Sequence, residues 1–254
     1  MITAELTFSV TDESDVEAVE LLMATWLKNG QIDGGSWLTA FAANVARVYV
    51  SVASPAALAD ASNNIYATQA LESLAKRGLT GPDIRLLGVD PDSPAPCQCT
   101  ERSSLILLTN YLSKLSPVSC GTCFGLVPLY CLPHIYDHEH LTILQWAADY
   151  RACDTLQMHC TTGERFGEQQ LWQHDSALSR QGREIARQLS ERAGVPVYYF
   201  LLKSRGTTTA AELARACPSC GGKWGLATPW HDFFDFRCDA CRLLSKRATS
   251  LTRE

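Results

Sequence analysis

Two Cys-x-x-Cys pairs in the last fifth of the chain constrain its fold more than any other feature. The first pair is Cys217 and Cys220, the second is Cys238 and Cys241, and 17 residues separate them. A tight turn lets two thiolates converge on one metal ion, and two such turns complete a tetrahedron. The spacing is typical of four-cysteine zinc sites. We therefore predict one structural zinc ion held by a zinc ribbon over 210–254; two disulfides or four metal-free thiols are the alternatives.

The cysteine count indicates a reducing compartment. The chain has 11 cysteines, an odd number that does not suit a complete disulfide framework. The N-terminal sequence MITAELTFSV has no basic region and carries Glu5 within its apolar pattern, unlike a signal peptide. No apolar run approaches the ~18 residues of a membrane span. We expect a cytoplasmic protein without a membrane partner.

The charge is unevenly distributed along the 254 residues, whose net charge is −5. Residues 1–90 contain 5 Lys/Arg and 11 Asp/Glu, whereas residues 210–254 contain 7 Lys/Arg and 5 Asp/Glu. A protein that binds polyanions over its whole surface would carry a basic surplus throughout. Any contact with nucleic acid is therefore expected in the C-terminal segment.

Residues 1–90 show the alternating periods of a ferredoxin-like unit. Strand patterns at 2–10, 36–41, 45–53 and 83–88 are interrupted by helical patterns at 13–28 and about 58–77. Thr11 and Asp12 offer oxygen atoms for the N-terminus of the first helix, and Asn29-Gly30 is a typical end for it. The order βαββαβ predicts a ferredoxin-like fold. That fold hosts many functions and implies none of them.

A second α/β unit is predicted over 101–205, after a linker rich in proline at 89–100. Strands are expected at 104–109, 126–132, 154–160 and 195–202, and helices at 139–152 and 168–193. Pro128 places the strand at 126–132 on a sheet edge, because proline cannot donate to a strand ladder. The expected fold class is α+β, with domains at 1–90, 101–205 and 210–254. Whether the two α/β units share one sheet stays open.

Three stretches carry a resemblance to a known family: SPVSCGTCFGLVPLYCLP at 116–133, ADYRACDTLQM at 148–158, and the ribbon sequence from 217 to 245. Together they resemble an uncharacterised bacterial family of zinc-ribbon proteins for which nucleic-acid binding has been suggested. The tail HDFFDFRCDACRL is the most specific part. The resemblance implies an α/β body followed by a ribbon and suggests a class of partner. It implies no established activity and no catalytic residues.

Aromatic and basic residues are concentrated in the ribbon. The rings are Trp224, Trp230, Phe233, Phe234 and Phe236. They could stack on nucleic-acid bases, or they could cover the zinc turns and dock the ribbon on the body. We favour docking, because burial of aromatic rings stabilises a small module more than their exposure does. The candidate phosphate contacts are Lys223, Arg242, Lys246 and Arg247.

A third Cys-x-x-Cys pair, Cys120 and Cys123, permits three interpretations. The two thiols could be redox-active, although a loop context does not lower a thiol pKa as a helix N-terminus does. They could form a second zinc site with Cys97 and Cys99, a pair from which 20 residues separate them. They could also be reduced thiols in an ordered loop, the alternative we weight most. Further ligands could come from His134, His138 and His140.

Two other patterns have simple structural explanations. Arg180, Arg183 and Arg187 share one face of the helix expected at 168–193, where they could meet phosphate or pair with Glu184 and Glu191. We favour the paired, solvated face. Three cysteines in apolar surroundings are expected to be small core residues: Cys131, Cys153 and Cys160.

The leading hypothesis is a non-enzymatic zinc-binding protein whose ribbon binds nucleic acid. The second is a protein-interaction adaptor in which the ribbon is purely structural. The third is a metal or thiol enzyme centred on Cys120 and Cys123. No catalytic residue is assigned, because no phosphate-binding loop or nucleophile motif stands out.

Overall fold

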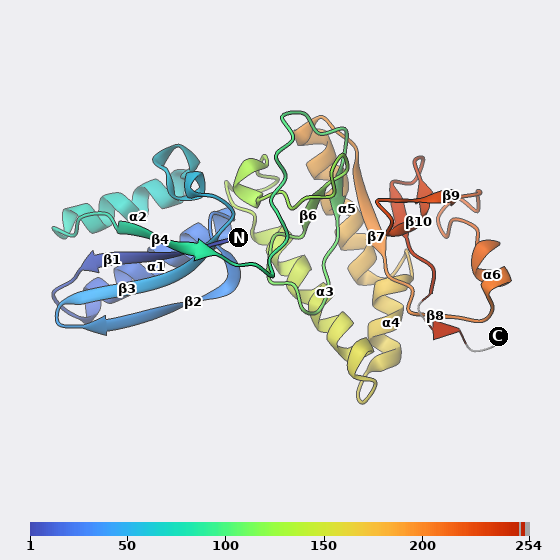
Figure 1. Ribbon diagram of the computed structural model, residues 1–254, viewed down its shortest axis with the longest axis horizontal. Coiled ribbons are helices and arrows are strands. Elements are labelled where there is room, and N and C mark those ends of the chain that lie inside the picture. Colours follow the sequence, from blue (N-terminus) through green and yellow to red (C-terminus); the bar gives the residue numbers. More distant parts are fainter. Residues whose placement is uncertain (249, 252–254) are drawn as a thin grey trace. The chain divides into compact units, whose positions relative to one another are not determined.

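The computed structural model describes residues 1–248 and 250–251 (Figure 1). The chain forms two compact units. The first comprises Met1–Gln98 with the short segments Lys114–Ser116 and Gly125–Thr142. The second comprises Cys99–Ser113, Pro117–Phe124 and the chain from Ile143 onward. Each unit has its own sheet, so the two predicted α/β units do not share one. The fold is mixed α+β.

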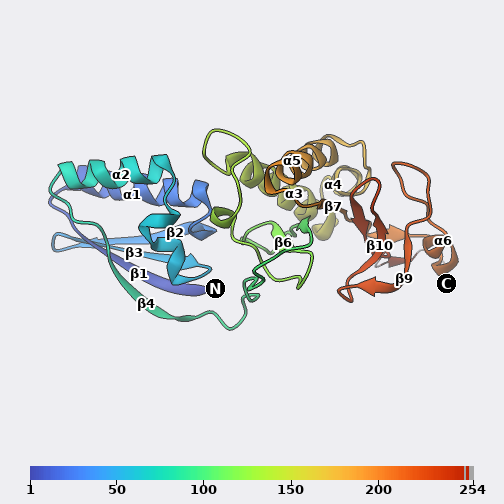
Figure 2. The same ribbon diagram turned by 90° about the horizontal axis from the view of Figure 1, so that it is seen from above.

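The first unit has the predicted order of elements. These are β1 (Ile2–Ser9), α1 (Glu13–Asn29), β2 (Asp33–Ala42), β3 (Val45–Val52), α2 (Ile65–Lys76) and β4 (Asp83–Val89). The strands lie in the order β2-β3-β1-β4, and β1 is antiparallel to both of its neighbours. Both helices cover the same face of this sheet (Figure 2). The βαββαβ order is confirmed.

The ends of helix α1 were predicted correctly because the residues that cap the helix lie next to it in the sequence. The Asp12 carboxylate accepts from the backbone N–H groups of Ser14 and Asp15, and Gly30 ends the helix with φ 72°. Met23 and Trp26 are almost fully buried in the core against the sheet. Helix α2 begins later than predicted, at Ile65, because residues 55–62 form two short 3₁₀ turns and Asn64 supplies the cap.

The second unit is built around a six-stranded sheet. Its strands are β5 (Leu105–Leu107), β6 (Val118–Cys120), β7 (Val197–Leu201), β9 (Gly225–Trp230), β10 (Phe234–Cys238) and β11 (Leu243–Ser245). The helices are α3 (Leu141–His159), α4 (Glu164–Trp172), α5 (Ala177–Ala193) and α6 (Thr209–Leu213). Two short strands, β8 (Arg205–Gly206) and β12 (Ser250–Leu251), pair separately.

The hairpin that carries the last cysteine pair belongs to this same sheet. The strand order is β6-β5-β7-β11-β10-β9, and β11 pairs in parallel with β7 through Leu243↔Tyr199 to Ser245↔Leu201. Ile106, Tyr198 and Phe200 therefore share a core cluster with Phe234 and Leu244. The separate domains at 101–205 and 210–254 stay a prediction, while the sheet itself runs through both ranges.

Three local predictions in the second half of the chain are wrong. Residues 126–132 form no strand beyond an isolated bridge from Leu126 to Pro96, and Leu129–Cys131 is a 3₁₀ turn. Residues 154–160 continue α3 as helix as far as His159. The single helix expected at 168–193 is two helices, α4 and α5, because Ser176 caps a new helix by accepting from the Ser179 N–H.

Helix α5 packs closely on β7 (Figure 1). A Cβ atom at Gly182 would lie 2.2 Å from the Tyr199 ring and 2.6 Å from Nε1 of Trp146. Only glycine allows this approach without a shift of the neighbouring rings. The contact fixes the position of α5 against the strand that receives the cysteine hairpin.

Candidate metal centres

The four C-terminal cysteines come together as a group that could hold a metal ion. One sulfur from each of Cys217, Cys220, Cys238 and Cys241 lies within 4.8 Å of the others. The Cys220 and Cys238 sulfur atoms are 3.8 Å apart. A tetrahedron of sulfur atoms about 2.3 Å from a zinc ion has edges of about 3.8 Å. The donor set and its dimensions therefore fit a tetrahedral metal ion with soft ligands.

The first turn of this group is shaped by its own backbone hydrogen bonds. The Gly221 N–H donates to the Cys217 carbonyl at 2.8 Å, and the Cys217 N–H donates to the Gly222 carbonyl at 2.9 Å. Gly221 has φ 70°, the left-handed conformation that glycine adopts without cost. A backbone N–H of Gly222 directed at the Cys220 sulfur lowers the pKa of that thiol to about 7. The turn thus favours a thiolate before any metal binds.

The second turn places its first thiol in a drier position. Cys238 ends β10 and is 8% exposed, and burial raises the pKa of its thiol to about 12. A buried thiolate needs a cation beside it, since an unpaired charge in an apolar site is costly. The Cys238 thiol is therefore expected to stay protonated when no metal is bound and to lose its proton to solvent when a metal ion binds the sulfur.

The ribbon rings dock the hairpin on the body, as we favoured from the sequence. Trp224, Phe234 and Phe236 are at most 2% exposed. Phe234 packs edge-on against Phe200, and Trp230 packs against Tyr198, with centroid distances of 5.7 Å in both pairs. Rings that are covered in this way are not free to stack on bases. The docking interpretation is confirmed.

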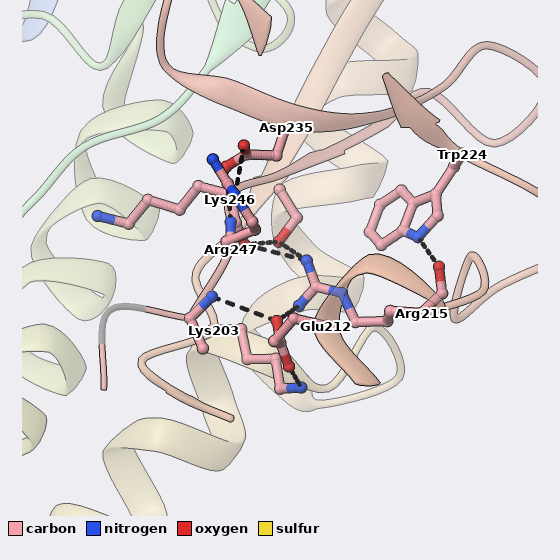
Figure 3. A network of polar contacts seen from close by, with 9 residues as sticks. Lys203, Glu212, Arg215, Trp224, Asp235, Lys246 and Arg247 are labelled. Atoms are coloured by element: carbon pink, nitrogen blue, oxygen red, sulfur yellow. Dashed lines mark hydrogen bonds and ion pairs between the residues drawn. The ribbon is translucent and has the colours of Figure 1, made fainter. Parts of the chain in front are cut away.

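A polar network holds α6 between the ribbon and the rest of the second unit (Figure 3). Glu212 is 2% exposed and forms ion pairs with Lys203 and with Arg215, the latter at 3.4 Å. The Arg215 guanidinium lies 4.1 Å from the Phe236 centroid and 4.6 Å from the Trp172 centroid. Trp224 Nε1 donates to the Arg215 carbonyl at 2.9 Å. The sequence analysis missed this network, because Lys203, Glu212 and Arg215 lie in or beside short segments for which no helix was predicted.

A second group of four thiols also could hold a metal ion. One sulfur from each of Cys97, Cys99, Cys120 and Cys123 lies within 4.8 Å of the others. The Thr122 N–H donates to the Cys120 sulfur at 3.3 Å. A Cβ at Gly121 would lie 1.9 Å from the Ser104 hydroxyl oxygen and 3.0 Å from the Ser104 carbonyl oxygen, so any larger residue here would force Ser104 to shift. The sequence left this grouping open among three alternatives, and the structure brings the four sulfur atoms together.

The tip of the ribbon hairpin contacts the Cys120–Cys123 turn. His231 lies between β9 and β10, and its Nε2 is 2.9 Å from the Gly121 carbonyl oxygen. The His231 ring stacks on Phe124, with centroids 5.2 Å apart and planes at 7°, and on Trp230 at 4.8 Å. A residue of the C-terminal hairpin therefore supports the turn that carries two thiols of the second group.

Other candidate ligands lie apart from these groups. His134 and His140 have ring centroids 4.5 Å apart, and His138 lies 6.4 Å from His134. Among the described residues, none of these three histidines belongs to a group that could hold a metal ion. Cys131 and Cys160 are exposed, so the prediction that they are core residues is wrong, while Cys153 is buried as expected.

The four candidate phosphate contacts do not form one patch around a single cavity. Lys223 and Arg247 line the same groove, of about 710 Å³, together with Asp235, which pairs with Arg247 at 2.8 Å. Arg242 lines a different cavity beside α5. Lys246 lies over the Phe233 ring, 5.5 Å from its centroid. Within the described residues, no helix is long and apolar enough to cross a membrane.

Three family models match successive parts of the chain, and all three describe a domain of unknown function. They cover residues 1–88 (DUF8589), 99–202 (DUF2310) and 206–250 (DUF8594). An uncharacterised protein of Haemophilus influenzae is 33% identical over 72% of this chain and 70% of its own length. Another uncharacterised protein of that organism is 34% identical over 67% of this chain and 84% of its own.

The chain belongs to the family of these uncharacterised proteins. A crystal structure of a proposed antibiotic biosynthesis monooxygenase from Deinococcus radiodurans aligns with 37% of this chain and 96% of that one. The identity is 18% and the TM-score 0.29, a likeness that carries no argument about activity.

Proposed function

We propose that this protein binds zinc at Cys217, Cys220, Cys238 and Cys241, and that the metal is structural. The observation that carries the proposal is the cluster of four sulfur atoms within 4.8 Å of one another. Zinc is the divalent ion most often held by four thiolates in a tetrahedron. Four protein ligands leave no open position for water or substrate, so this zinc stabilises the fold and takes no part in a reaction.

A second zinc ion at Cys97, Cys99, Cys120 and Cys123 belongs to the same proposal. This group has the same donors and the same upper limit on sulfur–sulfur separation. A filled S₄ site also accounts for Cys120 and Cys123 without a redox reaction. It therefore favours a binding protein over a thiol enzyme.

Metal analysis of the purified chain tests both assignments. Two zinc ions per chain are expected by elemental analysis, one after Cys97→Ser/Cys99→Ser and one after Cys217→Ser/Cys238→Ser. The controls are the exposed Cys160→Ser and the buried Cys153→Ser, which should keep two. Two zinc ions in the Cys217→Ser/Cys238→Ser variant would contradict the C-terminal assignment.

Nucleic acid is the partner class that we propose for the C-terminal segment, with Lys223, Arg242, Lys246 and Arg247 as contacts. The supporting observation is that Lys223 and Arg247 line one groove. The pairing of Arg247 with Asp235 reduces its free charge, so the expected affinity is modest. If the groove instead receives a protein segment, the chain is an adaptor with a structural ribbon.

Salt dependence separates these two partners. Fluorescence anisotropy with single- and double-stranded DNA and RNA should show binding that weakens as salt rises, because phosphate contacts release counterions. Arg242→Ala/Lys246→Ala/Arg247→Ala should flatten the slope by about one unit per lost contact and leave the zinc content unchanged. Absence of binding at low salt would remove nucleic acid and leave the adaptor.

A further inference from the structure

A cavity of about 430 Å³ lies along α5, away from the candidate nucleic-acid groove. One wall is a single stripe of α5, and the other is formed by the start of β7 and the turn after β10. The stripe comprises Arg180, Arg183, Glu184, Ala186, Arg187, Ser190 and Glu191. The opposite wall contributes Val197, Tyr199, Cys241 and Arg242. Every residue of the lining belongs to the second unit.

The charges that line the cavity do not cancel. Arg187 is paired on both sides, with Glu184 at 2.6 Å and with Glu191 at 2.5 Å, so the pairing expected from the sequence is confirmed for this one arginine. These two carboxylates are the acidic groups of the lining. Three arginines remain, and within the described residues none of them forms an ion pair: Arg180, Arg183 and Arg242.

The three remaining guanidinium groups keep donors for a ligand. Over residues 1–248 and 250–251, no hydrogen-bond partner is found for the Arg180 side chain. Arg183 uses Nη1 to donate to the His174 carbonyl at 2.8 Å, and Arg242 uses Nη1 to donate to the Tyr198 hydroxyl at 3.2 Å. A guanidinium has five N–H donors, so most donors of this set are unused.

The walls are held in place by the fold. Gly182 lets α5 approach β7 closely, and all five residues of β7 are buried. Arg242 has φ 54°, a conformation that is uncommon for a residue with a side chain, and its carbonyl accepts from the Tyr199 N–H at 2.8 Å. The backbone of the turn is thus fixed at Arg242. A cavity whose backbone is already ordered costs less conformational entropy on binding than one that must be ordered by the ligand.

We propose that this cavity binds a small organic phosphate, a phosphomonoester with a compact apolar or aromatic body. Arginine forks match phosphate oxygens in pairs, and three of them suit a dianion better than a single carboxylate. Ala186, Val197 and Tyr199, all buried, line the apolar floor of the cavity against which the organic part would lie. The volume exceeds the need of inorganic phosphate alone. This cavity is separate from the groove that Lys223 and Arg247 line, and Arg242 is the one proposed nucleic-acid contact that it shares.

Isothermal titration of the zinc-loaded full chain with phenyl phosphate tests the proposal. Phenyl phosphate is expected to bind more tightly than inorganic phosphate, and phenol is expected not to bind. Arg180→Ala should raise the dissociation constant roughly tenfold, and Arg180→Ala/Arg183→Ala roughly a hundredfold. Arg192→Ala is the matched control: it lies on the same helix, is exposed and does not line the cavity, so its affinity should equal that of the unmodified chain.

Circular dichroism and zinc content verify that each variant is folded. The proposal is overturned if neither phosphate compound binds at about 10 mM, a concentration above any useful affinity. It is equally overturned if Arg180→Ala and Arg192→Ala bind alike.

Discussion

The C-terminal cysteine group and the group at Cys97, Cys99, Cys120 and Cys123 offer a metal the same four sulfur atoms, yet their surroundings differ. Cys238 ends β10, whose neighbours in the sheet are β9 and β11, and buried rings cover the hairpin. Cys120 ends β6, an edge strand, and Cys123 is exposed. Two metal sites with identical ligands can therefore contribute unequally to the free energy of unfolding. The contribution depends on how much of the surrounding packing is lost when the metal is removed.

The largest effect is expected from the C-terminal group. Cys217→Ser/Cys238→Ser should lower the free energy of unfolding of the second unit by more than about 4 kcal/mol, since structural zinc in small modules contributes on the order of 10 kcal/mol. Urea denaturation followed by tryptophan fluorescence measures the loss. If the variant lost zinc but kept the stability of the unmodified chain, the C-terminal group would not contribute more to stability than the other group does.

The next largest effect should come from the network behind the ribbon. Glu212→Ala leaves Lys203 and Arg215 without their buried carboxylate, and we expect a loss of about 3 kcal/mol in unfolding free energy. The matched control is Glu184→Ala, which breaks an exposed pair and should cost less than about 0.5 kcal/mol. Equal effects of the two substitutions would mean that the buried pairs do not anchor the ribbon.

A smaller effect is expected at the second group. Cys97→Ser/Cys99→Ser should remove one zinc ion and lower the unfolding free energy by about 2 kcal/mol or less, the scale of the entropy that a cross-link removes from the unfolded chain. Thermal denaturation beside zinc analysis gives both quantities. A loss as large as that of Cys217→Ser/Cys238→Ser would show that the two groups contribute equally.

The smallest effect concerns the contact between the hairpin tip and the Cys120–Cys123 turn. His231→Ala removes the hydrogen bond to the Gly121 carbonyl and two ring stacks, at a cost of about 1 kcal/mol. His231→Phe keeps a ring and should recover part of that stability. Chelator competition should show faster zinc release from the second group alone; unchanged release would exclude support by His231.

Local signals predicted the elements whose residues are close in sequence. Asp12 and Gly30 delimit α1, and the spacing of Cys217 to Cys241 brought their four sulfur atoms together as expected. One ambiguous pattern led to a wrong prediction. The apolar run at 126–132 was predicted to be an edge strand, but Pro128 precedes a 3₁₀ turn at Leu129–Cys131.

Contacts between segments that are distant in the sequence could not be predicted from local sequence patterns. His231 lies 110 residues from Gly121, and nothing near either residue indicates that the two meet. The parallel pairing of β11 with β7 could not be predicted either, since both are short apolar runs that could pair with many other strands. From the sequence, the grouping of Cys97 and Cys99 with Cys120 and Cys123 was one of three interpretations, and the sequence did not favour it over both of the others.

The parallel pairing of β7 with β11 has a consequence for the order in which the chain assembles on the ribosome. Val197–Leu201 leaves the exit tunnel more than 40 residues before Leu243–Ser245, its partner strand. Until then one side of β7 presents unpaired backbone N–H and C=O groups, the kind of edge that recruits foreign strands. Synthesis of the last segment then closes this edge. If that segment captures the zinc ion that we propose for it, zinc supply during translation should influence how much of the protein escapes aggregation.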